Sequence, residues 1–132
     1  MENLIIKGSH GDFFMPDINF NAESGILEMS GESYLEDTAK FYAPILKWLR
    51  EYIEVAHGQI ILNIKLTYFN TSSSRSILDI LYIVKDFEDN KGDVIVNWFY
   101  NGEDKEIEEE VEDFMIDTGL KINLIQVDDN EL

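Results

Sequence analysis

Residues 59–100, QIILNIKLTYFNTSSSRSILDILYIVKDFEDNKGDVIVNWFY, decide the fold of this 132-residue chain. Residues 59–69 alternate in polarity, with an apolar side chain at every second position, which is typical of a β-strand. After a run of hydroxyl side chains, apolar residues recur at helical spacing over residues 77–87, and residues 90–92 supply a helix stop. Residues 93–100 alternate again. The segment therefore predicts a strand, a helix and a second strand in succession.

Two further helices are predicted, one on each side of this segment. Over residues 37–57 the apolar side chains recur at the spacing of a helix with one buried stripe. Pro44 lies inside that pattern, so either the regular helix begins near Pro44 or the helix is kinked there, and the sequence leaves both open. Residues 107–115 repeat the pattern in a strongly acidic helix that ends around Gly119, and residues 122–127 follow as a last strand.

The N-terminal part of the chain predicts antiparallel strands. Residues 4–6 form a short strand, and residues 17–21 and 26–29 are separated by a four-residue turn, an arrangement typical of a β-hairpin. We expect residues 1–127 to form a single α/β domain and residues 128–132 to form a frayed acidic tail.

The order of elements predicts a two-layer sheet fold. Strands that are joined by helical crossovers in one sheet run parallel. Polar residues interrupt the strands at Asn63, Lys65, Asn97 and Asn123, whereas a sheet covered on both faces reads as continuously apolar. We therefore expect an α/β fold with a mixed sheet of about six strands. An N-terminal antiparallel hairpin would precede a parallel C-terminal βαβαβ unit, with about three helices mainly on one face.

Charge and composition narrow the classes of partner. The chain has 27 acidic and 10 basic residues, a formal net charge of -17, which disfavours nucleic acid and anionic membranes as partners. It has no cysteine, which excludes disulfides and thiolate metal ligands. The N-terminus does not resemble a signal peptide, and no apolar stretch is long enough to suggest a membrane span. We expect a cytoplasmic protein.

Candidate catalytic and metal-binding residues are few. His10 and His57 lie far apart in predicted loops, and the turns that end at Gly92 and Gly102 lack the alternating oxygen ligands of a calcium loop. The carboxylates of residues 106–113 are explained as the solvated face of a helix. We therefore expect no metal, no cofactor and no catalytic residue, so an enzyme is disfavoured.

Aromatic side chains and hydroxyls provide the remaining candidates. Trp98 and Tyr100 are expected in the core, whereas Phe99 faces the other way and is a candidate for a partner or dimer surface. Residues 71–74 are four consecutive hydroxyl side chains at a strand-to-helix junction. Such residues either cap the helix or, because a helix N-terminus suits a phosphate, provide a phosphorylation site. Both interpretations remain open from the residues alone.

The segment 68–74, YFNTSSS, followed by LDIL at residues 78–81, resembles the signature of the SiaC-type regulatory phosphoprotein family. The resemblance extends in the same order over residues 18–29, residues 41–44 with Trp48 and Leu49, and residues 96–100. It implies a STAS-like fold, related in logic to anti-sigma-factor antagonists, and a partner-switching module. In such a module a Ser/Thr kinase adds a phosphate and a PPM-type phosphatase removes it. The unmodified protein binds and activates a diguanylate cyclase, which connects it to cyclic di-GMP and biofilm formation.

The resemblance also implies where the modification occurs. The family acceptor maps onto Thr71, with Ser72 and Ser73 as alternate acceptors or contacts beside Asn70. Phosphate adds only about -1.5 to -2 charges to a chain at -17, so its effect must be local. We expect Arg75, one turn on, to hold the phosphate.

Two alternatives to the switch remain. One is a constitutive interaction module or homodimer without a phosphoswitch. The less favoured one is a small carboxylate-dependent enzyme.

Overall fold

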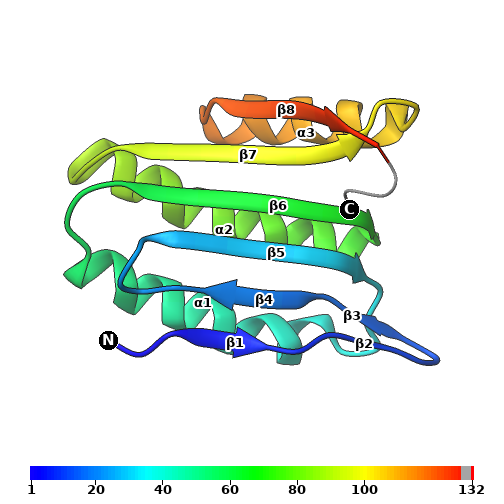
Figure 1. Ribbon diagram of the computed structural model, residues 1–132, viewed down its shortest axis with the longest axis horizontal. Helices are drawn as coiled ribbons and strands as arrows, with labels where there is room; N and C mark the ends of the chain where they lie inside the picture. The colour runs from blue at the N-terminus through cyan, green and yellow to red at the C-terminus, as the bar shows by residue number, and fades with distance from the viewer. Residues whose placement is uncertain (129–131) are drawn as a thin grey trace.

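The structure, a computed structural model, describes residues 1–128 and Leu132. Its main feature is a six-stranded sheet with the order β1-β4-β5-β6-β7-β8, beside a separate sheet of β2 and β3 (Figure 1). The strands are β1 (Leu4–Ile6), β2 (Ser9–His10), β3 (Phe14–Met15), β4 (Asp17–Phe20), β5 (Ile26–Ser33), β6 (Ile60–Phe69), β7 (Val94–Asn101) and β8 (Ile122–Val127). The helices are α1 (Thr38–Val55), α2 (Thr71–Asn90) and α3 (Lys105–Thr118).

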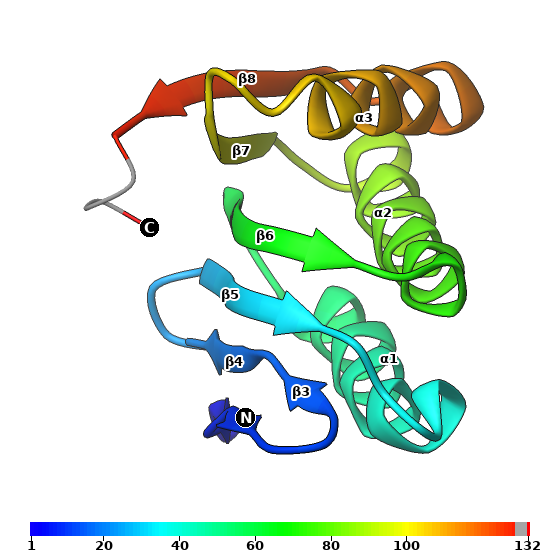
Figure 2. The same cartoon turned by 90° about the vertical axis from the view of Figure 1, so that its right-hand side faces the viewer.

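Strand direction changes in the middle of the main sheet. β4 pairs antiparallel with both β1 and β5, whereas β5, β6, β7 and β8 pair in parallel. Each parallel step passes through one helix: α1 joins β5 to β6, α2 joins β6 to β7, and α3 joins β7 to β8. Seen from the side in Figure 2, all three helices cover the same face of the sheet. The predicted two-layer α/β fold with a mixed sheet is confirmed.

The core lies between the sheet and the helices. Alternate residues of β6 face the helices and are buried, as the sequence pattern predicted. Trp98 of β7 is fully buried against the rings of Phe69 and Phe114, at centroid distances of 5.6 and 5.9 Å. Its indole Nε1 has no hydrogen-bond partner among the described residues. Trp48 Nε1, in contrast, donates to the carbonyl oxygen of Glu2 at 2.9 Å and so ties the N-terminus to α1.

The face of the sheet away from the helices is partly polar. Asn63, Asn97 and Asn123 lie side by side on β6, β7 and β8. Asn97 Nδ2 donates to Asn63 Oδ1, and Asn123 Nδ2 donates to Asn97 Oδ1, both at 3.0 Å. Lys65 Nζ lies 5.4 Å from the centroid of the Phe99 ring. The polar residues that interrupt the strand patterns therefore interact across strands on the face that no helix covers.

Helix α1 begins before Pro44. The Asp37 side chain caps it by accepting a hydrogen bond from the Lys40 N–H at 3.1 Å, and the helix runs on from Thr38. The interpretation in which the regular helix begins near Pro44 is therefore wrong. Pro44 lies inside the helix at an exposed position, where the carbonyl oxygen that it leaves unpaired is open to water.

The C-terminal end of α1 is capped from another element. Its last turn contains no basic residue. Lys91, which follows α2, instead extends its Nζ to the carbonyl oxygens of Ile53 and Glu54, at 3.0 and 2.8 Å. Because the last carbonyl groups of a helix have no partner within the helix, this ammonium group satisfies two of them.

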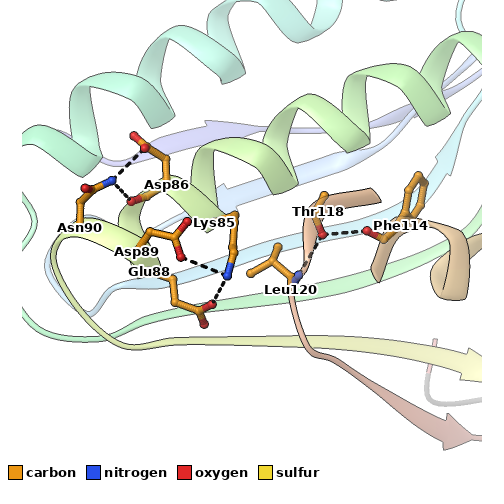
Figure 3. A network of polar contacts seen from close by, with 8 residues as sticks. All are labelled: Lys85, Asp86, Glu88, Asp89, Asn90, Phe114, Thr118 and Leu120. Atoms are coloured by element: carbon orange, nitrogen blue, oxygen red, sulfur yellow. Dashed lines mark hydrogen bonds and ion pairs between the residues drawn. The ribbon is translucent and has the colours of Figure 1, made fainter. Parts of the chain in front are cut away.

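The C-terminal end of α2 carries a local polar network (Figure 3). Lys85 Nζ lies 3.1 Å from Asp89 Oδ1 and 3.2 Å from Glu88 Oε1, and hydrogen bonds to these two carboxylates raise the pKa of Lys85. Asn90 Nδ2 donates to the carbonyl oxygen of Asp86 at 2.8 Å. These contacts connect neighbouring turns at the end of the helix.

Helix α3 ends where the sequence predicted, at Gly119. The glycine has a φ of 77°, the left-handed conformation that often follows a helix, and its N–H donates to the Met115 carbonyl oxygen. The Thr118 side chain adds two further hydrogen bonds at this helix end (Figure 3). Its Oγ1 donates to the Phe114 carbonyl oxygen at 2.7 Å and accepts the Leu120 N–H at 3.1 Å. The chain then turns directly into β8.

Several boundaries differ from the expectations. Strand β5 continues to Ser33, beyond the predicted end at Met29, and the short β2–β3 hairpin was not predicted. The predicted acidic tail, residues 128–132, includes residues 129–131, which lie outside the described residues. Within the described part of the chain, none of the helices has the length and apolar composition needed to cross a membrane.

Candidate functional site

The hydroxyl run forms the first turn of α2, beyond the carboxyl end of β6. Asn70 is the residue that caps this helix. Its Oδ1 accepts the Ser73 N–H at 3.0 Å, and its carbonyl oxygen accepts the Ser74 N–H at 2.9 Å. The interpretation of the hydroxyls as the helix cap is therefore wrong, because an amide performs that task.

Ser73 belongs to the interior of the protein. It is completely buried, and its Oγ donates to the carbonyl oxygen of Ser33 at 3.0 Å. Ser33 Oγ in turn donates to Ser73 Oγ at 2.7 Å. Because the Ser33 hydroxyl has only one proton, the contact at 2.8 Å between Ser33 Oγ and the Tyr42 hydroxyl must have Tyr42 as its donor. This arrangement leaves Ser73 inaccessible, so the expectation of Ser73 as an alternate acceptor does not fit the structure.

The Tyr42 phenol is held in its neutral form. Burial raises the pKa of Tyr42 from 10.0 to about 12, and the hydrogen bond with Ser33 offsets only part of that rise. Tyr42 therefore remains a hydrogen-bond donor throughout the physiological pH range. The chain Tyr42–Ser33–Ser73 connects α1, β5 and α2 beneath the hydroxyl run.

Ser72 connects the N-terminal turns of the two helices. Its Oγ donates to Asn70 Oδ1 at 3.2 Å. The contact at 2.7 Å between Ser72 Oγ and Thr38 Oγ1 consequently has Thr38 as its donor. Ser72 is exposed, but its hydroxyl already takes part in two hydrogen bonds.

Thr71 differs from both neighbours. It is the first residue of α2 and is exposed. Its hydroxyl makes no hydrogen bond to any residue that the structure describes, and the backbone N–H groups of Thr71 and Ser72 likewise have no partner within residues 1–128. An accessible hydroxyl therefore lies beside two free donors at a helix N-terminus, the arrangement that favours a phosphate.

Arg75 lies one turn after Thr71, on the same side of α2. Its side chain is 74% exposed, and its Nε lies 3.5 Å from Asp79 Oδ1. Exposed ion pairs of this kind contribute about 0–1 kcal/mol, so Arg75 can exchange Asp79 for a stronger anion at little cost. Arg75 is therefore within helical reach of a group added to Thr71.

Sequence reasoning missed two of the residues that build the site. Ser33 and Thr38 were not identified, because hydroxyl residues at a strand end and a helix start carry no distinctive pattern. Tyr42 was assigned only to the buried stripe of its helix. Its phenolic group was the available signal, since a buried tyrosine hydroxyl requires a partner. Among the described residues, no group of three or more His, Cys, Asp or Glu side chains could hold a metal ion.

Comparisons with known proteins place the whole chain among related sequences. A family model described as SiaC family regulatory phosphoprotein matches residues 7–127. An uncharacterized protein of Pseudomonas aeruginosa strain UCBPP-PA14 is 26% identical over 117 residues, which cover 89% of this chain and 90% of that protein.

Solved structures are also similar. The crystal structure of apo-SiaC from Pseudomonas aeruginosa has a TM-score of 0.85 at 25% identity, covering 95% of this chain and 99% of the other. A second match is the crystal structure of the diguanylate cyclase SiaD in complex with its activator SiaC, also from Pseudomonas aeruginosa. It has a TM-score of 0.85 at 24% identity. That match covers 94% of this chain and 99% of the other.

Proposed function

The chain belongs to the SiaC family of regulatory phosphoproteins, and from this we propose that it is a non-enzymatic signalling protein whose phosphorylation at Thr71 controls the binding and activation of a diguanylate cyclase. Support for the cyclase comes from the P. aeruginosa SiaC, which was solved with the cyclase SiaD as its activator. The phosphorylation site that we propose is Thr71.

One observation carries the choice of Thr71. It alone among the candidate acceptors Thr71, Ser72 and Ser73 combines exposure with a hydroxyl that makes no hydrogen bond within the described residues. A phosphate there receives the two free N–H groups at the start of α2 and the Arg75 guanidinium. A partner that docks over Thr71 would have to desolvate the phosphate dianion once Thr71 is modified, which is costly. Phosphorylation therefore opposes docking.

The rest of the module follows from the family. A Ser/Thr kinase adds the phosphate, a PPM-type phosphatase removes it, and the output is cyclic di-GMP and biofilm regulation. Residues 1–127 act as a single regulatory domain in the cytoplasm, where the nucleoside triphosphate that the kinase uses is present. The description of the family as regulatory phosphoproteins supports the addition of a phosphate, and the other assignments are part of the proposal.

The test compares modified and unmodified protein. The cyclase of the same host is assayed for binding and for activity with unmodified protein, with stoichiometrically phosphorylated protein and with Thr71→Ala. We expect the unmodified protein and Thr71→Ala to activate the cyclase and the phosphorylated protein to lose binding at least tenfold. The matched control is Ser72→Ala, which should still accept one phosphate by intact-mass measurement. Equal binding of the phosphorylated and unmodified forms would contradict the proposal.

A second candidate function is a constitutive homodimer. It is favoured by the open face of the sheet, where the half-buried Phe99 and the asparagine ladder are covered by no helix. This candidate expects a dimer mass in light scattering that Phe99→Lys reduces to a monomer, and no phosphoprotein in the native host. A monomer at all concentrations would remove it.

A further inference from the structure

An exposed cluster of three aromatic rings lies at the sheet edge where β5 and β6 end. Phe13, Tyr34 and Tyr68, which we call the aromatic patch, are 38%, 42% and 49% exposed. The Phe13 and Tyr34 rings stack at a centroid distance of 5.9 Å, and the Tyr34 and Tyr68 rings lie 6.3 Å apart. Rings at these distances form one continuous surface. Contiguous exposed surface of this kind marks a site of interaction with another molecule.

Backbone hydrogen bonds hold the aromatic patch in place. The Phe14 N–H donates to the Tyr34 carbonyl oxygen at 2.7 Å, and the Tyr34 N–H donates to the Phe14 carbonyl oxygen at 2.9 Å. This bridge attaches the β2–β3 hairpin to the residue that follows β5, at the end of the sheet where β5 and β6 terminate (Figure 1). Because the rings are already positioned, a partner that binds them loses less conformational entropy.

A β-bulge turns Tyr68 toward this surface. The register of β5 against β6 shifts at Thr67, which leaves Glu32 opposite Tyr68. Before that point every second residue of β6 is buried, and an unbroken strand would bury Tyr68 as well. Phe69 packs against Trp98 of the core instead, and Tyr68 is exposed. Bulges re-aim side chains at functional positions, so the exposure of Tyr68 is a built feature of the strand.

Three carboxylates accompany the rings. Glu32 lies opposite Tyr68 on the neighbouring strand, and Asp12 and Glu36 are close in sequence to the other two rings. Among the described residues none of the three takes part in an ion pair, and no cationic side chain lies over a ring of the patch. The patch therefore combines electron-rich ring faces with unpaired negative charges, and both attract a cation.

We propose that the aromatic patch is the docking site for an arginine-bearing segment of a protein partner. Guanidinium groups of that segment stack on the Tyr34 and Tyr68 rings and pair with Glu32. Arginine fits this site better than lysine, because its planar guanidinium both stacks on aromatic rings and presents a fork of donors to a carboxylate. A second copy of this acidic chain would bring like charges against the patch, and a wholly apolar segment would leave Glu32 uncompensated.

The aromatic patch is separate from the helices. Its residues belong to the β2–β3 hairpin, to the position after β5 and to the end of β6, and none of them belongs to α1 or α2. Tyr68 nevertheless precedes Thr71 by three residues, which span about 10 Å at most in an extended chain. A partner bound to the patch therefore lies within reach of Thr71 without covering either helix. This docking surface goes beyond the proposed function and does not depend on the phosphorylation of Thr71.

Two synthetic peptides of equal charge test the proposal. The probe alternates arginine with glycine, and the comparison peptide has lysine in place of arginine. Binding to the full chain is measured by NMR titration in about 150 mM salt, where attraction by distant charges is screened. Tyr68→Leu removes one ring of the patch, and Glu32→Gln removes one charge. The matched controls are Tyr82→Leu, at an exposed tyrosine of α2, and Glu109→Gln, at an exposed carboxylate of α3, with circular dichroism to verify each fold.

We expect Tyr68→Leu and Glu32→Gln each to weaken binding of the arginine peptide about threefold, the effect of losing one exposed contact between a cation and a ring or a carboxylate. Tyr82→Leu and Glu109→Gln should stay within about 1.5-fold of wild type, because isolated surface positions contribute little. The lysine peptide should bind more weakly than the arginine peptide, and the chemical-shift changes should centre on the aromatic patch.

Other outcomes would overturn the proposal. If Tyr68→Leu and Glu32→Gln bind the probe as their controls do, or if the shift changes centre on the acidic residues 106–113, the peptide responds to net charge and not to the patch. If the patch signals shift with protein concentration in the absence of peptide, its occupant is a second copy of the chain. None of these results alters the comparison of phosphorylated and unmodified protein in the cyclase assay, so the two proposals fail independently.

Discussion

At the scale of single residues, the site depends on a buried network of hydrogen bonds between hydroxyl groups, each with a defined donor. The Tyr42 hydroxyl donates to Ser33 Oγ, Ser33 Oγ donates to Ser73 Oγ, and Ser73 Oγ donates to the Ser33 carbonyl oxygen. Each of the three hydroxyl protons therefore has one acceptor. Such a buried network is stable only when it is fully satisfied, since an unpaired buried polar group costs about 1–3 kcal/mol. The first turn of α2 is therefore held from below, while Thr71 stays accessible above it.

The Tyr42→Phe substitution removes the first donor of this network. At pH 8 we expect the variant to lose about 1 kcal/mol of unfolding free energy, the usual contribution of one hydrogen bond. The difference should change with pH, because burial raises the pKa of Tyr42 from 10.0 to about 12. Tyr42 then loses its proton in the unfolded chain before it does so in the folded one. Its contribution to stability is complete below pH 10 and is lost as the pH rises to 12.

Phenylalanine has no such proton, so the stability difference between wild type and variant should shift by about 1.4 kcal/mol between pH 8 and pH 11, which leaves wild type slightly the less stable of the two at pH 11. Urea unfolding of both proteins at the two pH values measures this change. Equal differences at both pH values would mean that the Tyr42 phenol ionises in the folded protein as it does in the unfolded chain.

The sequence singled out Thr71 as a candidate, and the modification of Thr71 stays a prediction, but it said little about the residues around Thr71. Thr71 could be found because a hydroxyl run at a strand-to-helix junction is a local pattern and because the family resemblance singles out this position. Ser33 lies 40 residues from Ser73 along the chain, so no local pattern connects them. The pattern of β5 also ended too early, because Ser33 is polar yet completely buried. Burial of a polar residue depends on a distant partner, and a single sequence does not specify it.

At the scale of secondary-structure elements, the helix ends depend on neighbouring elements. Lys91, just after α2, bonds the last carbonyl groups of α1. Removing its ammonium group should weaken the contact between the C-terminal ends of both helices. This role cannot be read from α1 alone, whose last turn has no basic residue.

For Lys91→Met we expect a loss of about 1 kcal/mol in unfolding free energy, because two helix carbonyl groups lose a charged donor. Lys47→Met is the control: it removes the same charge from an exposed position of α1 and should change stability by less than about 0.5 kcal/mol. Urea unfolding at pH 7 measures both variants. A loss of equal size in the two variants would assign the effect to net charge and not to the carbonyl contacts.

Glu110 on helix α3 has a raised pKa. Partial burial, and then the neighbouring charges of Asp113 and Glu106, raise the pKa of Glu110. A raised carboxyl pKa means that ionised Glu110 opposes folding at neutral pH, and that this opposition disappears as the pH falls and the folded chain takes up the proton.

Glu110→Gln should therefore stabilise the protein at pH 7 by about 0.2–0.5 kcal/mol, the usual size of a like-charge pair on a helix surface. Thermal unfolding at low and high salt checks the cause. The gain should be clear at low ionic strength and should diminish in about 0.5 M NaCl, where the repulsion is screened. A gain that persists undiminished at high salt would assign the effect to the desolvation of the Glu110 carboxylate and not to repulsion by Asp113 and Glu106.

The sequence pattern was sufficient to predict the helices and six of the strands, although β5 was predicted too short, but it failed for β2 and β3. Residues 59–69 and the stripes of the three helices have enough repeats for the pattern to be unambiguous. Strands β2 and β3 pair only two residues each, so they offer no alternation to detect. Pro44 was ambiguous because a proline inside a helix is tolerated where water can reach the freed carbonyl oxygen, and exposure of that turn is a tertiary property.

At the scale of the whole molecule, the sequence predicted the layers but not the strand order. Helical crossovers require β6, β7 and β8 to be parallel. Placement of the N-terminal hairpin required one further fact, that α1 carries the chain from β5 to a parallel β6 at the sheet centre. Several placements of the hairpin satisfy the same apolar pattern, so the order follows from packing and not from local sequence.

The net charge of -17 should make stability depend on salt. Repulsion between like charges is strongest in the compact state, and added salt screens it. Raising NaCl from about 20 to 500 mM should increase stability by about 1 kcal/mol, which corresponds to about 4 °C in Tm for a chain of this size.

Calorimetry at pH 7 measures the shift. The control is the same comparison near pH 4.5, where the carboxylates carry less charge and the shift should be smaller. An identical shift at both pH values would attribute the effect to a general action of the salt and not to screening.

The two tryptophans give the molecule intrinsic fluorophores in separate regions. Trp48 is tied to the N-terminal backbone, whereas Trp98 lies in the core against Phe69, the residue before the Asn70 cap of α2. A Trp48→Phe chain would emit from Trp98 alone. The packing beneath the first turn of α2 would then be visible as emission wavelength and quenching, with no attached dye, while a partner binds or a phosphate is added.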